Sequence, residues 1–321
     1  MKKIAVLADY LEPSHHALID STAARCGFAV DYYPDCRVPA ELAGTYEVVH
    51  GMPKPGDLKA FTGMKWFCGS FAGVDAYLDD ALYPSPEVML SNSSGAYGVT
   101  IAEHLIMVTL MLLRHAPAYL HHADAHRWGP VMPMHSLIGS TITVLGTGDI
   151  GTEFARRAKA MGAKAIRGVR RTKKAADPAF DGVFTHEELD SLLPDTDILV
   201  MALPSTADTV GILSRDRIAL LPETAYVINV GRGTAIDQPA LVEALNAGKL
   251  AGAALDVFEK EPIPAGDPVW DAKNLLITPH ISGQMSLGYT RDKNVALFCE
   301  DLENYAAGRP LKRYVDRKIG Y

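Results

Sequence analysis

The sequence contains few cysteines, no excess of positive charge and no long apolar run. Its four cysteines (Cys26, Cys36, Cys68 and Cys299) lack metal-site spacing, so we expect reduced thiols and no bound metal. The 31 lysines and arginines are outnumbered by 38 aspartates and glutamates, and the net charge of −7 argues against general affinity for nucleic acid or membranes. No stretch approaches the ~18 apolar residues of a membrane span, and Asp9 interrupts the short apolar N-terminal run. We therefore expect a cytoplasmic protein.

Short apolar runs alternate with helical patterns along almost the whole chain, which predicts a parallel α/β fold. A chain of 321 residues is long enough for two domains. The runs expected to form strands are 3–9, 28–33, 46–52, 65–69, 88–92, 141–146, 165–169, 197–204, 225–231, 251–257 and 275–280. Helices are expected over 98–114, 238–248 and 288–308, and directly after the run 141–146. The segment 98–114 is apolar on most faces, which predicts a buried helix that joins the domains.

Residues 146–151 read G-x-G-x-x-G between an expected strand and an expected helix. Gly146 then permits a tight turn, Gly148 lets the backbone approach a pyrophosphate, and Gly151 lets helix and strand pack closely. The helix start at Asp149 and Ile150 supplies N–H groups for the phosphates. The pattern predicts a dinucleotide site, with a purely structural glycine turn as the alternative. The residues expected on the buried helix face are Ile150, Phe154, Ala158 and Met161.

Positive charge clusters after the next expected strand, at Arg167, Arg170, Arg171, Lys173 and Lys174. In an NAD site this strand ends with an acid that binds the ribose 2′-hydroxyl, whereas here Arg170 stands in that position. Arg170 and Arg171 would attract a 2′-phosphate, and Thr172 would add a hydroxyl. We therefore predict NADP(H) in preference to NAD(H). A solvated basic loop with no preference is the alternative.

Three further stretches follow expected strands and carry polar residues: Arg232 in 228–237, Glu261 in 252–262, and His280 in 275–283. Histidine is suited to proton transfer near neutral pH, and a neighbouring carboxylate would orient its ring. An arginine fork binds a carboxylate in a fixed plane. The set suits a 2-oxo acid that is anchored by one group and protonated by another. Taken singly, each has a structural alternative: a salt-bridged arginine, a surface acid and a core histidine.

Five segments in order, "GTGDIG", "ALPSTADT", "INVGRGTAID", "GAALDVFEKEP" and "ITPHISG", make the chain resemble the D-isomer-specific 2-hydroxyacid dehydrogenase family over nearly its whole length. The resemblance implies two Rossmann-like, doubly wound parallel-sheet domains with a cleft between them. Residues 1–97 plus 289–321 would form a flavodoxin-like substrate-binding domain, and residues 98–288 an NAD(P)-binding domain that forms a homodimer. The implied reaction is reversible reduction of a small 2-oxo acid, such as glyoxylate, hydroxypyruvate or pyruvate, to the D-2-hydroxy acid.

The same resemblance assigns roles to individual residues. Arg232 would bind the substrate carboxylate and carbonyl oxygen, His280 would act as general acid and base, and Glu261 would pair with it. Backbone N–H groups of Ala72, Gly73 and Val74 would hold the substrate carboxylate. The residues implied at the cofactor are Thr100, Gly146, Gly148, Asp149, Ile150, Gly151, Arg170, Arg171, Thr172, Leu203, Pro204, Thr209, Val230, Gly231, Asp256 and Gly283, with Asp256 lining the nicotinamide pocket.

Departures from the family pattern leave other functions open. Phe71 stands where a small residue is usual and is expected to narrow the substrate pocket. Other candidates near the pocket are Tyr97, Trp128 and His135, the last two in a region that a partner subunit would supply. Glu261 replaces the glutamine of related formate dehydrogenases, which argues against that activity. A formate- or phosphite-type dehydrogenase and a cofactor-sensing, corepressor-like binding protein remain as alternative functions.

Overall fold

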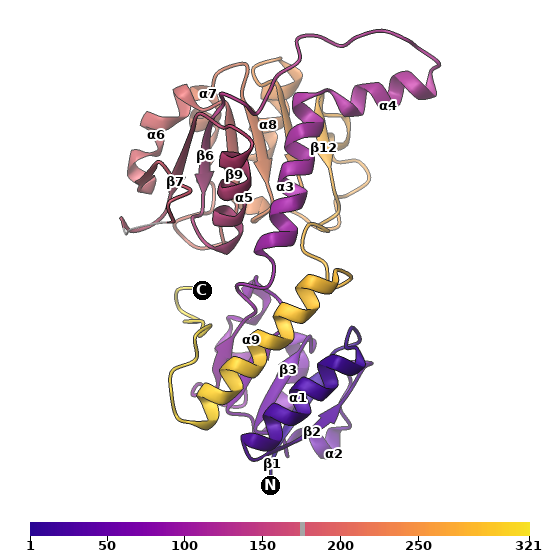
Figure 1. Cartoon of the computed structure of the whole chain (residues 1–321), viewed down its shortest axis with the longest axis vertical. Helices are drawn as coiled ribbons and strands as arrows, with labels where there is room; N and C mark the ends of the chain where they lie inside the picture. The colour runs from indigo at the N-terminus through magenta and orange to yellow at the C-terminus, as the bar shows by residue number, and fades with distance from the viewer. Residues whose placement is uncertain (174–176) are drawn as a thin grey trace. The chain divides into compact units, whose positions relative to one another are not determined.

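The structure, a computed structural model, describes residues 1–173 and 177–321, and the chain divides into two compact units (Figure 1). Unit 1 comprises Met1–Tyr97 and Gln284–Tyr321, and unit 2 comprises Gly98–Gly283. The second segment of unit 1 therefore begins at residue 284 rather than at the expected 289. The prediction of an α/β architecture built from parallel sheets is confirmed in both units.

Unit 1 is built on a five-stranded parallel sheet in the order β2-β1-β3-β4-β5. Its strands are β1 (Lys2–Leu7), β2 (Phe28–Tyr32), β3 (Val48–Gly51), β4 (Trp66–Gly69) and β5 (Met89–Ser91). Its helices are α1 (Pro13–Arg25), α2 (Ala40–Ala43) and α9 (Gly288–Ala306), with 3₁₀ turns η1 (Pro55–Ala60), η2 (Asp75–Tyr77) and η3 (Asp80–Leu82). The C-terminal helix α9 thus returns to the unit that the N-terminus begins.

Both faces of this sheet are buried, as expected for parallel strands. Ile4 and Val6 of β1 pack in one cluster with residues of α1 and α9, which lie side by side (Figure 1). The alternate residues Ala5 and Leu7 pack in a second cluster with side chains from η1 and the surrounding loops. The near-continuous apolar run of this strand follows from burial on both sides.

Unit 2 is built on a seven-stranded parallel sheet in the order β12-β11-β10-β9-β6-β7-β8. Its strands are β6 (Thr141–Leu145), β7 (Ala165–Val169), β8 (Gly182–Phe184), β9 (Ile198–Met201), β10 (Tyr226–Asn229), β11 (Gly252–Leu255) and β12 (Leu275–Ile277). Its helices are α3 (Gly98–Leu113), α4 (Ala116–Asp124), α5 (Asp149–Ala160), α6 (Leu189–Leu192), α7 (Arg215–Leu220) and α8 (Gln238–Asn246), with short 3₁₀ turns η4 to η7 at His186–Glu188, Leu193–Asp195, Gly233–Ala235 and Pro268–Asp271. The chain order reverses between β6 and β9, where ligands of such sheets bind.

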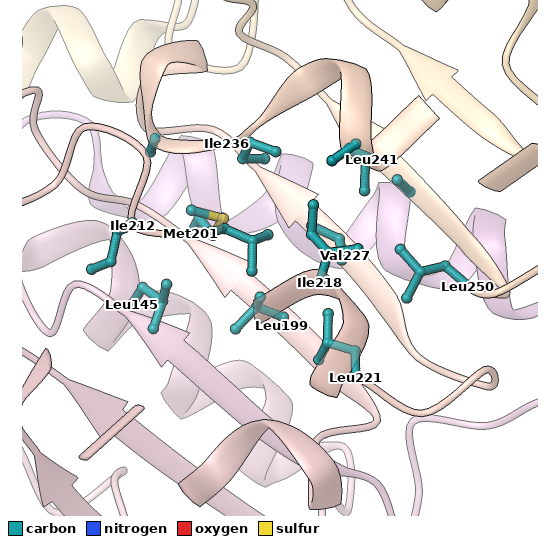
Figure 2. Packing of buried hydrophobic residues seen from close by; sticks show 14 of the residues in the cluster. Leu145, Leu199, Met201, Ile212, Ile218, Leu221, Val227, Ile236, Leu241 and Leu250 are labelled. Carbon is teal, nitrogen blue, oxygen red and sulfur yellow. The ribbon is translucent and has the colours of Figure 1, made fainter. Parts of the chain in front are cut away.

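Helices cover both faces of the unit 2 sheet. Figure 2 shows strand residues Leu199, Met201 and Val227 packed against Ile218 of α7 and Leu241 of α8. Helix α3 contacts α5 and the strands β10 and β11. Burial of these apolar side chains is the main stabilising contribution, at about 25 cal/mol per Å² removed from water.

The sequence prediction differs from the structure at several places in unit 2, including helix α4, which was not predicted. Strand β8 was not predicted, because Gly182–Phe184 is short, half-buried and at the edge of the sheet. Met161 was expected on the buried face of α5, but the helix ends at Ala160 and Met161 is 37% exposed. Phe154 and Ala158 are buried as predicted, together with Gly151 and Ala155, whereas Ile150 is only half-buried.

Candidate active site

The three residues predicted to carry the chemistry follow three neighbouring strands. Arg232 follows β10, Glu261 follows β11, and His280 follows β12. These strands are adjacent in the parallel sheet, so their carboxyl ends lie at one edge. The topology therefore brings together side chains that are separated by 48 residues in the sequence.

His280 and Glu261 form a direct pair. His280 Nδ1 lies 2.7 Å from Glu261 Oε2, and the other carboxylate oxygen accepts a hydrogen bond of 2.8 Å from the Phe258 N–H. The two side chains are 53% and 35% exposed. The carboxylate is thus fixed by the backbone and fixes the imidazole, while the pair stays accessible to a ligand.

The backbone of His280 is held in an unusual conformation. Its φ angle is +54°, and its N–H donates to the carbonyl oxygens of Asp256 and Thr278 at 2.9 and 3.1 Å. A non-glycine residue adopts this left-handed region only at an energetic cost. The surrounding hydrogen bonds offset that cost and set the direction of the side chain.

The Asp256 carboxylate holds the residues on both sides of His280. This carboxylate, in a residue only 1% exposed, accepts bonds from the Thr278 hydroxyl (2.6 Å) and from the N–H groups of Ile281 (2.9 Å) and Ser282 (3.0 Å). The role expected for Asp256 beside a nicotinamide stays a prediction. Its observed contacts are with the loop that carries His280.

Arg232 sits on a loop held by Asn229. The Asn229 amide donates to the Arg232 carbonyl at 2.9 Å and accepts from the Gly231 N–H at 3.0 Å, while Arg232 Nη1 donates to the Gly231 carbonyl at 2.7 Å. A Cβ atom on Gly233 would lie 1.9 Å from the carbonyl carbon of Phe258. The Arg232 loop therefore packs directly on the backbone that orients Glu261.

Asn229, Thr278 and His104 take part in this arrangement but were missed in the sequence. His104 of α3 lies 3.4 Å from the Thr278 hydroxyl, and burial lowers its pKa while Asp256 opposes that effect. Asn229 and Thr278 stand within "INVGRG" and "ITPH". A search for polar residues one to three positions from each charged candidate would have found Asn229 and Thr278, whereas no sequence spacing relates His104 of α3 to them.

The glycine-rich turn has the shape needed for a dinucleotide. Gly146 has φ of +102°, and its Cβ would lie 2.5 Å from the Ala202 carbonyl oxygen; a Cβ on Gly151 would lie 1.9 Å from the Gly146 oxygen. A Cβ on Gly148 would meet nothing within 4 Å. Internal packing thus requires two of the glycines, whereas the third borders open space beside the N-terminus of α5. A closely approaching phosphate group would account for a glycine there.

The residues of the basic cluster after β7 differ in their contacts and in their exposure. Arg167 reaches the Leu192 carbonyl, and Lys173 pairs with Glu188 at 3.1 Å. Arg170 is half-buried at the end of β7, and Arg171 and Thr172 are exposed. Lys174 lies outside the described residues. Because β7 is adjacent to β6, Arg170 and Arg171 follow the strand next to the glycine turn.

The remaining residues expected at the cofactor lie mostly along the same edge of unit 2. Leu203 and Val230 are buried, Pro204 and Gly283 are half-buried, and Thr100 is buried in the first turn of α3. A Cβ on Gly231 would lie 2.6 Å from the backbone of Leu203, so these loops pack closely. The Thr209 hydroxyl donates to the Pro204 carbonyl at 2.6 Å and accepts from Thr206, which makes it a support for this turn.

The loop expected to hold the substrate carboxylate follows β4 in unit 1. Ala72 is half-buried, Gly73 is exposed, and the Val74 side chain is buried in the core. The Phe71 ring stacks on Tyr77 with centroids 4.6 Å apart and packs against the same core. The expectation that Phe71 narrows a substrate pocket stays a prediction.

Among the described residues, no group of three or more histidine, cysteine, aspartate or glutamate side chains has the geometry of a metal site. All four cysteines are free. Within residues 1–173 and 177–321, no single helix has both the length and the apolar character to cross a membrane, although the bent pair α3 and α4 meets that criterion when taken together.

Comparison with known proteins gives consistent matches. Residues 106–282 match the family described as D-isomer specific 2-hydroxyacid dehydrogenase, NAD binding domain. Glyoxylate/hydroxypyruvate reductase A of Salmonella newport is 31% identical over 257 residues, which are 78% of this chain and 80% of that protein. A D-isomer specific 2-hydroxyacid dehydrogenase family structure from Aeromonas salmonicida has a TM-score of 0.84 at 30% identity, covering 98% and 99% of the two chains. The NADPH-dependent glyoxylate/hydroxypyruvate reductase of Sinorhizobium meliloti, in complex with NADP and sulfate, has a TM-score of 0.82 at 26% identity, covering 100% of both chains.

Proposed function

The chain belongs to the D-isomer specific 2-hydroxyacid dehydrogenase family of NAD(P)-dependent oxidoreductases, and on that premise we propose that it reduces a small 2-oxo acid of the glyoxylate, hydroxypyruvate or pyruvate type to the D-2-hydroxy acid. The bound dinucleotide would supply the hydride for carbon 2. The residues of the chain would bind the acid, orient it and supply the proton for the carbonyl oxygen. The reductases of Salmonella newport and Sinorhizobium meliloti support this substrate class.

The observation that carries the proposal is the His280–Glu261 pair beside the Arg232 loop. With Nδ1 engaged by the carboxylate at 2.7 Å, Nε2 is the nitrogen that would give its proton to the substrate oxygen. The Arg232 guanidinium would bind the carboxylate and the carbonyl oxygen as negative charge grows on that oxygen. Glu261 would support the protonated imidazole, and the reverse reaction would use the same residues in opposite protonation states.

Oxidation of NADPH, followed at 340 nm, tests the proposal. Glyoxylate, hydroxypyruvate, pyruvate and phenylpyruvate serve as substrates, and formate and phosphite with NAD(P)⁺ test the alternative dehydrogenases. We expect His280→Ala to lower kcat by roughly 10²–10⁴-fold with a smaller change in KM, while the control His16→Ala, on α1 of unit 1, keeps wild-type kinetics. Near-normal kcat in His280→Ala, or turnover with formate or phosphite alone, would contradict the assignment.

We infer a preference for NADP(H) from the residues that follow β7. Arg170 and Arg171 place positive charge after the strand next to the glycine turn, where an acid would repel a 2′-phosphate. Arg170→Ala should raise KM for NADPH and leave KM for NADH unchanged. Lys173→Ala is the matched control because Lys173 already pairs with Glu188. Equal KM values for the two cofactors in the wild type would remove this inference.

We also propose that two copies associate through unit 2. Helix α4 and the segment after it extend away from the body of the unit (Figure 1). This arm carries exposed apolar side chains: Leu120, Trp128 at 102% exposure, Met132, Met134 and Ile138. Sedimentation velocity should give a dimer for the wild type and a smaller species for Trp128→Ser/Met132→Ser; a monomeric wild type would exclude the association. The cytoplasmic location stays a prediction of the sequence.

A further inference from the structure

A buried polar network lies in unit 1 beneath the loop that follows β4. The Tyr10 hydroxyl is 2.7 Å from Ser70 Oγ and 2.8 Å from Asn294 Oδ1, and the Asn294 amide donates to Ser93 Oγ at 2.5 Å. All four residues are buried, and Asn294 is fully so. The network joins α9 to the ends of β1 and β4, across 284 residues of sequence.

The backbone carbonyl groups of residues 69–72 all accept hydrogen bonds from one short segment of the chain. Gly69 O accepts from the Ser93 hydroxyl at 3.0 Å, and Ser70 O accepts from the Tyr97 hydroxyl at 2.5 Å. Phe71 O accepts from the Ser93 N–H at 2.9 Å, and Ala72 O accepts from the Asn92 amide at 2.6 Å. Residues 92–97 therefore fix four successive carbonyl groups.

Fixing these carbonyls also fixes the N–H groups of the loop. A peptide group is planar and trans, so its N–H points opposite to its C=O. The carbonyls of Ser70, Phe71 and Ala72 set the direction of the N–H groups of Phe71, Ala72 and Gly73, away from residues 92–97. Within the described chain, these three N–H groups have no acceptor. Successive unpaired N–H groups form a concave site for an anion.

The geometry points to Tyr10 and Asn294 as positioning residues for the substrate carboxylate; this inference rests on the proposed function. Both side chains are buried beneath the loop. Tyr10 fixes the Ser70 side chain, and Asn294 fixes the Ser93 hydroxyl that holds Gly69 O. A buried polar group costs free energy unless it is paired, and a fully paired network enforces one conformation. Here that conformation is the one in which the three N–H groups face the same ligand.

Tyr10→Phe tests the inference because it removes one hydroxyl and both of its bonds. We expect KM for a 2-oxo acid, and Kd for the unreactive analogue oxamate, to rise by about 3- to 10-fold, as for loss of neutral hydrogen bonds. KM for NADPH should stay unchanged. Tyr305→Phe is the matched control, since it removes another tyrosine hydroxyl bond of unit 1, to Glu47, outside the network.

A methyl ester of the same 2-oxo acid separates positioning from general destabilisation. The ester lacks the carboxylate, so its KM should be equal in the wild type and in Tyr10→Phe. Ser93→Ala, which removes the bond to Gly69 O, should reproduce the selective effect and replaces Tyr10→Phe if that variant does not fold. Unchanged oxamate affinity in a folded variant, or an equal effect on acid and ester, overturns the inference.

Oxamate binding requires no turnover, so it distinguishes the inference from the proposed function. A wild type that binds oxamate but reduces no 2-oxo acid would contradict the function and leave the positioning test in force. A wild type that neither binds oxamate nor reduces a 2-oxo acid would overturn both.

Discussion

Protonation of His50 should destabilise unit 1 as the pH falls from 6.5 to about 4. His50 lies on β3 with no exposed surface, stacked on Phe298 at 3.9 Å between ring centroids. Its Nδ1 is 3.1 Å from the Cys68 carbonyl, and Nε2 has no hydrogen-bond partner among the described residues. Burial lowers the pKa of His50 from 6.5 to about 4, although the bond to Cys68 opposes this.

The direction and size of the effect follow from proton linkage. Above pH 6.5 the histidine is neutral in both the folded and the unfolded chain, so it contributes no pH dependence. Between pH 6.5 and about 4, only the unfolded chain takes up a proton, and the free energy of unfolding falls as the pH falls. The difference between these two pKa values corresponds to a loss of about 3 kcal/mol in the free energy of unfolding.

Urea denaturation at pH 7.5, 6.5, 5.5 and 4.5 measures this loss, with fluorescence of the buried Trp66 as the probe of unit 1. Trp66 stacks on Phe298, which also stacks on His50. In His50→Asn, the side-chain amide replaces the imidazole Nδ1–H as donor to the Cys68 carbonyl, and this amide does not titrate. The variant should therefore lose most of the pH dependence, even though its stability at pH 7.5 is lower than that of the wild type.

The matched control is His126→Asn, since His126 is exposed and its positive φ angle tolerates asparagine. Titration of the carboxylates is common to all three proteins and cancels in the comparison. If wild type and His50→Asn lost stability in parallel between pH 6.5 and 4.5, the reasoning about His50 would be refuted.

Three further predictions concern unit 2. Gly148→Ala should raise KM for NADPH by at least about 10-fold, or ~1.4 kcal/mol, at little cost in Tm, because the added Cβ meets no protein atom within 4 Å; a normal KM would show that no ligand approaches this turn. Gly233→Ala should destabilise the protein by about 1–3 kcal/mol in thermal denaturation, because its Cβ would overlap the Phe258 backbone; unaltered Tm would contradict this. Glu261→Gln should lower kcat by roughly 10²-fold and alter the pH–rate profile with little change in KM for NADPH; wild-type kinetics would remove its role.

Most of the fold was predictable because both sheets are parallel and buried. Strands covered on two faces are near-continuous apolar runs, and their turns are marked by glycine and proline. Strand β8 lacks that signal because its three residues are only half-buried at the edge. Met161 was misplaced because helical periodicity gives no sign of where the last turn ends.

The candidate site was predictable because its charged residues stand in loops that follow strands. Arg232 and His280 lie soon after β10 and β12, and Glu261 lies further along the loop after β11. The order of these strands places the three loops at one edge of the sheet. The network of Tyr10 and Asn294 was not predictable, because its members lie on separate elements and have no common spacing. The contacts of Phe71 depend on the Tyr77 ring, which no local pattern relates to it.

The left-handed backbone at His280 has an evolutionary consequence. Glycine or asparagine would adopt that φ angle with less strain, by roughly 1 kcal/mol. Replacement of the histidine by glycine would therefore relax the fold while removing the proposed proton donor. Selection for heat resistance alone would favour that replacement, and only a demand for the proposed proton transfer would oppose it.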